Sequence, residues 1–182
     1  MIAYKGFQKG LSAAATSSCR GLTGRKRQTG RENGFHCAEN PLDCLSYYSD
    51  MDESEYYIVN AGGDMDEDGS DTKISCTELT VLKRLSREDF FLHSLAYMAD
   101  HPLREWNIHV RKDRAEAYWG YAIVRGIDPA ARGKTGDMLA FAKEDPVSGR
   151  IVQIALAQID GKKVRPDTWY GTDLTERQVA LI

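Results

Sequence analysis

Alternating apolar and polar residues predict two short strands and a helix near the start of the chain. Residues 2–7 read as a strand with two distinct faces, and residues 34–37 as a second extended segment. Asn40 is a favourable residue just before a helix, and Pro41 suits the first helical position. We therefore expect a two-turn helix that continues through Tyr48.

Two segments rich in β-favouring residues follow, at residues 55–61 and 73–82. The residues between them, 62–71, are rich in glycine and carboxylates. Turn-forming residues between two strand-like segments favour a hairpin. The pattern therefore predicts an antiparallel pair of strands with an acidic tip.

The middle third of the sequence has a helical pattern. Ser86, followed by Asp89 three residues later, gives a start that is similar to a capping box. An apolar stripe follows at Phe90, Phe91, Leu95 and Met98. Pro102 is expected to end or kink this helix, and residues 103–118 are interpreted as a second helix.

Strands are expected again in the last third of the chain. Residues 137–143 and 150–159 flank a turn-forming segment, and Asp160-Gly161 is a strong hairpin signal before residues 162–166. The sequence therefore predicts an α+β fold, with antiparallel sheet or hairpins at both ends and a helical middle third.

Length and composition fit a folded protein. At 182 residues with 42% hydrophobic content, the chain can form a single domain over residues 1–182, with a subdivision near Arg84 left open. No apolar run reaches the roughly 18 residues of a membrane span, and the first ten residues lack the apolar core of a signal peptide. We expect a cytoplasmic protein that does not enter a membrane.

The cysteines form no closely spaced pair. In a reducing compartment they are expected to be small buried residues rather than disulfides. A zinc site can be drawn from the three later cysteines and His36, but its spacing does not match the usual zinc patterns. The residues concerned are Cys19, Cys37, Cys44, Cys76 and His36.

The two signs of charge are separated along the chain, although the net charge is only -3. Nine carboxylates and no Lys or Arg lie between Asp50 and Asp71, whereas five basic residues and no acid lie between Arg20 and Arg31. A block of one sign produces a field that can steer a partner of opposite charge.

Each block therefore predicts a different partner. The acidic block suits a basic protein that handles nucleic acid, and its proposed binding residues are Asp50, Asp52, Glu53, Asp64, Asp66, Glu67, Asp68 and Asp71. The basic block suits a phosphate backbone, with non-specific binding of double-stranded DNA as the expected result. Its residues are Arg20, Arg25, Lys26, Arg27 and Arg31.

A calcium loop is the alternative interpretation of the acidic segment. Asp64, Asp66, Asp68 and Gly69 have the alternating spacing with which such a loop begins. Ser75 stands where a bidentate glutamate is required, so an acidic hairpin tip is the better interpretation. The common nucleotide, hydrolase and metalloprotease motifs are absent, and no cofactor, metal or catalytic residue is expected.

One resemblance points to an enzyme. Gly34-Phe35-His36, the helix after Asn40 and the pair Tyr47-Tyr48 resemble the strand and helix that hold nicotinamide in ADP-ribosyltransferases. Tyr4-Lys5-Gly6 would stand at the first NAD-contacting strand of that family. The usual His or Arg of that strand is absent here, and no catalytic glutamate can be placed. The resemblance implies roles for Tyr4, His36 and Tyr47.

A second resemblance covers more of the chain. Tyr4 to Phe7, Gly34 to Asp43 and the segment Asp160-Gly161 to Tyr170, with its PDTWY ending, resemble an uncharacterised family of phages and mobile elements. Within it, residues 90–106 (FFLHSLAYMADHPLREW) and 124–134 (VRGIDPAARGK) are similar to a type II-A anti-CRISPR family of gut Firmicutes. The resemblance implies a non-enzymatic inhibitor of the RNA-guided nuclease, with or without its guide RNA. An accessory DNA-binding protein of a mobile element is the third alternative.

Overall fold

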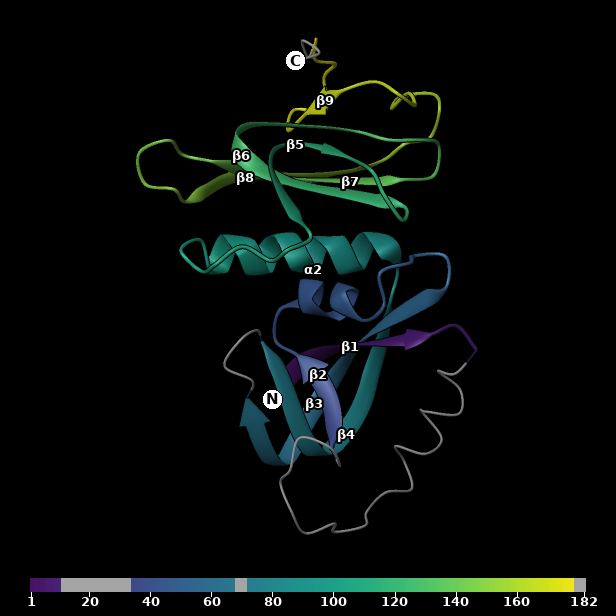
Figure 1. Cartoon of the computed structure of the whole chain (residues 1–182), viewed down its shortest axis with the longest axis vertical. Coiled ribbons are helices and arrows are strands. Elements are labelled where there is room, and N and C mark those ends of the chain that lie inside the picture. Colours follow the sequence, from purple (N-terminus) through teal and green to yellow (C-terminus); the bar gives the residue numbers. More distant parts are fainter. Residues whose placement is uncertain (11–33, 68–71, 179–182) are drawn as a thin grey trace. The chain divides into compact units, whose positions relative to one another are not determined.

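The computed structural model describes residues 1–10, 34–67 and 72–178, and it has the expected α+β fold (Figure 1). Strands make up most of it, and a helix lies in the middle of the sequence. The chain divides into two compact units, Met1–Ser86 (unit 1) and Arg87–Ile182 (unit 2). The five basic residues proposed to contact phosphate, and Asp68 and Asp71, lie outside the described residues.

Unit 1 is a closed barrel in the order β1-β2-β4-β3, in which each pair of neighbouring strands is antiparallel. The strands are β1 (Ile2–Gln8), β2 (Phe35–Ala38), β3 (Ser54–Glu67) and β4 (Lys73–Leu85). Alternate residues face the interior, as expected for a sheet with one buried face. The interior contains Ala3, Phe7, Cys37, Tyr57, Val59, Ala61, Ile74, Cys76 and Leu79.

The predicted helix after Asn40 is present as the 3-10 helix η1 (Pro41–Ser46). The Asn40 side chain caps it by accepting a hydrogen bond from the Leu42 N–H at 3.1 Å, and Pro41 occupies its first turn. The helix is shorter than expected: it ends at Ser46, before Tyr47 and Tyr48. Both tyrosines therefore leave the helix and are available to other contacts.

The β3–β4 hairpin is longer than the sequence predicted. A register shift between Gly62 and Met65, with Gly63 at φ 71°, lets β3 continue to Glu67. The Asp64 N–H donates to the Thr77 Oγ1 at 2.9 Å across this irregularity. The prediction of a loop from residue 62 was therefore wrong, because pairing with β4 holds this segment as strand.

Unit 2 contains one described α-helix and a five-stranded sheet with the order β5-β6-β7-β8, to which β9 adds beside β6. β5, β6 and β7 run parallel, whereas the β7–β8 and β6–β9 pairs are antiparallel. The elements are α2 (Arg87–Asp100), β5 (Val110–Glu116), β6 (Tyr121–Arg132), β7 (Met138–Glu144), β8 (Ile151–Gln158) and β9 (Tyr170–Gly171).

The first predicted helix of the middle third is confirmed as α2. Its expected stripe of Phe90, Phe91, Leu95 and Met98 is buried, and the helix ends before Pro102. α2 packs against β7 and β8. No helix among the described residues is both long enough and apolar enough to cross a membrane.

The second predicted helix, over residues 103–118, is wrong. Residues 110–116 of this segment form β5, whose Val110 pairs with Ile123 of β6. Val110 and Ala115 are buried in unit 2, although the charged residues between them are exposed. Pairing with a buried neighbouring strand outweighs the local helical pattern.

The predicted strand over residues 162–166 is also absent. The Asp160 Oδ1 accepts hydrogen bonds from the backbone N–H groups of Lys162, Lys163 and Val164 at 2.8 to 3.0 Å. An aspartate that bonds its own following backbone stabilises a turn. The Asp160-Gly161 pair thus forms a turn without a returning strand.

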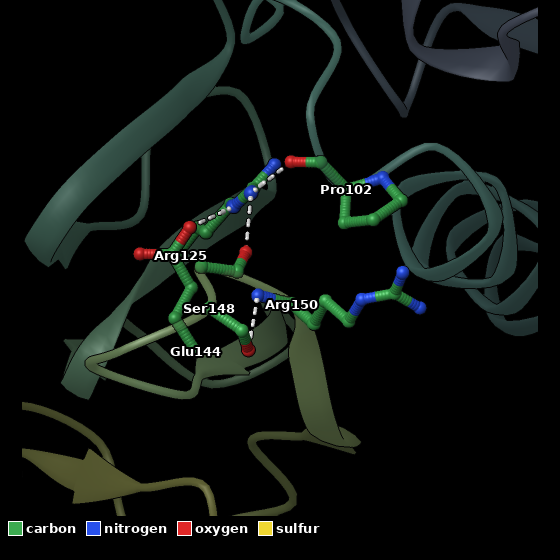
Figure 2. Close-up of polar contacts among 6 residues, drawn as sticks. Pro102, Arg125, Glu144, Ser148 and Arg150 are labelled. Atoms are coloured by element: carbon green, nitrogen blue, oxygen red, sulfur yellow. Dashed lines mark hydrogen bonds and ion pairs between the residues drawn. The ribbon is translucent and has the colours of Figure 1, made fainter.

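A buried arginine connects the segment after α2 to the sheet of unit 2 (Figure 2). The Arg125 Nε donates to the Glu144 Oε1 at 2.6 Å, and its Nη2 donates to the Pro102 carbonyl at 2.6 Å and the Gly149 carbonyl at 3.4 Å. Its guanidinium also lies over the Trp106 ring at 4.7 Å. Only 4% of its side chain is exposed, so these groups take the place of solvent around the guanidinium.

We expect Arg125→Ala to destabilise unit 2 by about 3–5 kcal/mol, because it leaves Glu144 unpaired where little solvent can reach it. Arg132→Ala is the matched control, since its ion pair with Glu116 is more exposed and should cost about 0–1 kcal/mol. Urea unfolding followed by tryptophan fluorescence measures both effects, because all three tryptophans lie in unit 2. Equal losses in the two variants would contradict this role for Arg125.

Candidate functional site

Unit 1 contains a pocket of about 170 Å³ between β1, β2, η1 and the start of β4. Strand β1 contributes Tyr4 to Gly6, and β2 contributes His36 to Ala38. Tyr47 and Tyr48 line it from the residues that follow η1, and Lys73 from β4. Segments that are far apart in the sequence therefore meet at one concave site.

A glycine brings Tyr48 close to β1. A Cβ atom at Gly6 would lie 2.5 Å from the Tyr48 Cδ2, so a larger residue would displace the ring. The Tyr56 hydroxyl donates to the Tyr48 carbonyl and fixes the backbone at this point. The Tyr48 ring therefore forms a wall of the pocket directly against the β1 backbone.

Lys73 and Tyr47 form a second part of the wall. The Lys73 Nζ donates to the Tyr47 hydroxyl at 3.3 Å and lies 5.1 Å from the centre of its ring. Tyr47 is 61% exposed, so one side of the ring is accessible to a ligand. An ammonium group beside an accessible aromatic ring suits a planar ligand with a negative or hydrogen-bond-accepting group.

His36 lies between two cations and is held neutral. Burial lowers the pKa of His36 most, and the charges of Lys73 and Lys5 lower it further. Its Nδ1 lies 3.1 Å from the Ser75 Oγ, and the Lys5 Nζ donates to the His36 carbonyl at 2.6 Å. A neutral imidazole with one nitrogen bonded to a hydroxyl can exchange a hydrogen bond or a proton with a ligand.

Asp43 lines the same pocket, but its carboxylate is used within the protein. The Asp43 Oδ2 accepts hydrogen bonds from both the N–H and the hydroxyl of Thr72. The Thr72 Oγ1 in turn accepts a hydrogen bond from the Asn40 N–H at 2.8 Å. Because Asp43 and Thr72 are buried, this group joins η1 to the start of β4 and is poorly placed to act as a base.

The cysteines near the pocket, Cys37, Cys44 and Cys76, are free and buried, as expected from their spacing in the sequence. Burial raises the pKa of Cys44 to about 12, and a hydrogen bond with Cys76 raises that of Cys37. Cys37 and Cys44 are therefore weak nucleophiles at neutral pH, whereas the same hydrogen bond lowers the pKa of the buried Cys76. No three His, Cys, Asp or Glu side chains among the described residues lie close enough together to hold a metal ion.

The structure brings together the residues matched to the ADP-ribosyltransferase motif, because Tyr4, His36 and Tyr47 all line this one pocket. Sequence reasoning did not identify Lys73, which meets Tyr47 only because β4 pairs with β2. No signal in the local sequence marked that contact.

The acidic residues do not form one patch. Asp50, Asp52 and Glu53 precede β3, whereas Asp64, Asp66 and Glu67 lie in its last residues. At about 3.3 Å per residue, the two groups are roughly 30 Å apart along the strand. Asp64, Asp66 and Glu67 are exposed, and none forms an ion pair with another described residue. Each group therefore presents its own local negative field.

We expect Lys73→Met to raise the pKa of His36, because the substitution removes a nearby positive charge that disfavours the imidazolium. The pKa should stay below its ordinary value, since burial is the larger cause of the shift. NMR titration of the His36 ring measures the change. Lys83→Met, ten residues further along β4, is the control and should leave the titration unaltered. An unchanged pKa in the Lys73 variant would show that the two side chains do not interact.

The first half of the chain matches a known protein family. The model of a domain of unknown function, DUF7666, matches residues 1–93, which include the whole of unit 1 and about half of α2. No curated protein and no solved structure matches the chain. Because the matched residues are more than half of the 182 in the sequence, the chain belongs to the DUF7666 family.

Proposed function

We propose that this protein is an anti-CRISPR inhibitor that binds the RNA-guided nuclease of type II-A systems and blocks cleavage of target DNA. The observation that carries the proposal is the row of exposed carboxylates Asp64, Asp66 and Glu67 at the end of β3, which lack ion pairs among the described residues. The resemblance of residues 90–106 and 124–134 to an anti-CRISPR family supports the same function.

The chemistry of the nuclease explains why carboxylates would bind to it. Such nucleases hold their nucleic acids in positively charged channels and read the short DNA motif beside the target with arginines. A hairpin strand with negative charge can occupy such a site in place of phosphates. This inhibition needs no catalytic turnover, so one inhibitor is required for each nuclease.

The basic residues extend the proposal to nucleic acid. Arg20, Arg25, Lys26, Arg27 and Arg31 supply enough positive charge to neutralise several phosphates of DNA or guide RNA. These residues lie outside the described part of the chain, so their role depends on the sequence alone. Binding of this kind weakens steeply as the salt concentration rises.

A triple variant tests the acidic residues. We expect changing Asp64, Asp66 and Glu67 to Ser to slow association with guide-loaded nuclease by about tenfold at low salt, with little change at high salt, because screening shortens the reach of charge. Surface-based kinetics measures the on-rate. The control changes the exposed Asp100, Glu105 and Asp128 of unit 2 to Ser, which alters net charge equally.

A second arm changes Asp50, Asp52 and Glu53 to Ser and shows whether the other acidic group also contributes. Equal on-rates for the β3-end variant and the unit 2 control would exclude the end of β3 from the interaction. Loss of the interaction in all three variants would indicate a dependence on net charge alone.

A second candidate function is a transferase that uses NAD, which we propose because Tyr4, His36 and Tyr47 line one pocket. An aromatic wall, a neutral histidine and nearby lysines suit a nicotinamide ring with its amide. The departures in the sequence weigh against it, since no catalytic glutamate is placed and Asp43 is bonded to Thr72.

Titration of nuclease activity separates the two functions. For the inhibitor we expect a block without NAD, an end point at or above one inhibitor per nuclease, and no mass change of the nuclease. Tyr47→Ala should retain this block, and its exposed side chain makes loss of folding a minor concern. A block by trace amounts of protein that requires NAD, adds mass to the nuclease and is lost in Tyr47→Ala would establish the transferase instead.

A further inference from the structure

Strand β8 is an unprotected edge of the sheet in unit 2. β8 (Ile151–Gln158) pairs with β7, and no described strand pairs with its other side. Its sequence, IVQIALAQ, contains no charged residue and no proline, and Val152 and Ile154 are 60% and 40% exposed. Edge strands of this kind are able to pair with a further strand, unless charge, proline or a covering segment prevents it.

The opposite edge of the same sheet has the usual protection. β5 (Val110–Glu116) carries exposed charges at Arg111, Lys112 and Arg114. It also has an irregular register between Lys112 and Arg114. Charged and irregular edges resist pairing with other chains. The contrast makes β8 the edge that suits an additional strand.

The hydrogen-bonding groups of β8 define how a new strand would pair. The Ile159 N–H donates to the Asp137 carbonyl at 2.9 Å, so this residue faces β7. Bonding direction alternates along an antiparallel strand, so Ile154, Leu156 and Gln158 direct their backbone groups away from β7. The irregularity in the β7–β8 register lies before Gln153, which leaves the rest of β8 regular.

We propose that β8 pairs with β8 of a second copy of this chain, antiparallel, about a two-fold axis near Ala155. This register places Ile154 of each copy opposite Leu156 of the other, and both residues have outward-facing backbone groups. The centre of the pair is aliphatic and contains no like charges. Two sheets of unit 2 then join into one continuous sheet.

Charge complementarity at the ends favours a second copy over an unrelated strand. Arg150 and Asp160 lie five residues before and five after Ala155. The two-fold axis therefore brings Arg150 of one copy within side-chain reach of Asp160 of the other, at both ends of the pair. Backbone N–H groups, first that of Lys162, lower the pKa of Asp160, which keeps its carboxylate charged at neutral pH. The strand is thus complementary to itself in hydrogen-bonding direction and in charge.

Sedimentation equilibrium of the full chain tests the pairing. We expect a mass that rises with concentration from 20.4 kDa towards twice that value. Val152→Lys should raise the dimer dissociation constant by at least about tenfold, because it puts a charge on the edge. Val147→Lys, at a 93% exposed position in the turn before β8, is the matched control and should leave the constant unchanged. A mass that stays at 20.4 kDa, or a dimer dissociation constant that does not change in Val152→Lys, would overturn the proposal. The edge of β8 would then be open to pairing with a different strand.

Exchange of charges gives a second test, in which mixed and homotypic dimers of the same variants are compared, so that any effect of D160K on the turn held by Asp160 is present in both. R150E alone and D160K alone each place like charges at both ends of the pair, so each should dimerise about tenfold more weakly than the unaltered chain. A mixture of R150E with D160K restores opposite charges at both ends of the mixed pair. Native mass spectrometry should therefore detect mostly mixed dimers. A statistical mixture of the three dimers would contradict the proposed register.

Discussion

The hydrogen bonds among Asp43, Thr72 and Asn40 are the interaction on which the pocket of unit 1 depends. They join the 3-10 helix to the first residue before β4, across about thirty residues of sequence. A buried carboxylate with these partners cannot lose one of them without exposing an unsatisfied polar group, which costs about 1–3 kcal/mol. The contact therefore fixes where Tyr47 leaves the helix and where Lys73 enters the strand. Both walls of the pocket follow from that placement.

Much of the fold could be predicted where a segment's own pattern agrees with its environment. α2 has both a helical stripe and a sheet to cover, and β1 alternates between an interior and an exterior face. The helix predicted over residues 103–118 was wrong because the charged residues, which have the pattern of an exposed helix surface, lie on the exposed edge strand β5. The strand predicted over residues 162–166 was wrong because the Asp160 side chain accepts hydrogen bonds from the backbone N–H groups of the turn, so no returning strand is needed. In the first case, pairing with a strand distant in sequence outweighed the local helix pattern. In the second, hydrogen bonds from a nearby side chain outweighed the local strand pattern.

The candidate site could be predicted only in part for a similar reason. Tyr4, His36 and Tyr47 were found from a resemblance in motif, and they meet in one pocket. Lys73 was not found, because its position beside Tyr47 depends on the pairing of β2 with β4. The acidic segment shows the converse error. Carboxylates adjacent in sequence were treated as one block, but an extended strand separates them by far more than the screening length of about 8–10 Å.

The boundary of the family match divides the functional questions. The matched residues 1–93 contain the whole pocket and the carboxylates at the end of β3, whereas β8 lies outside them. A function of the pocket therefore concerns the domain that the family shares, whereas pairing through β8 concerns the part of this chain outside the family match. The two are physically compatible, since a dimer of inhibitors presents two acidic hairpins. Two linked sites raise the effective concentration of the second after the first has bound, provided that both can reach their targets. Pairing through an edge strand in one unit would thus give each assembly two copies of the electrostatic contact made by the other unit.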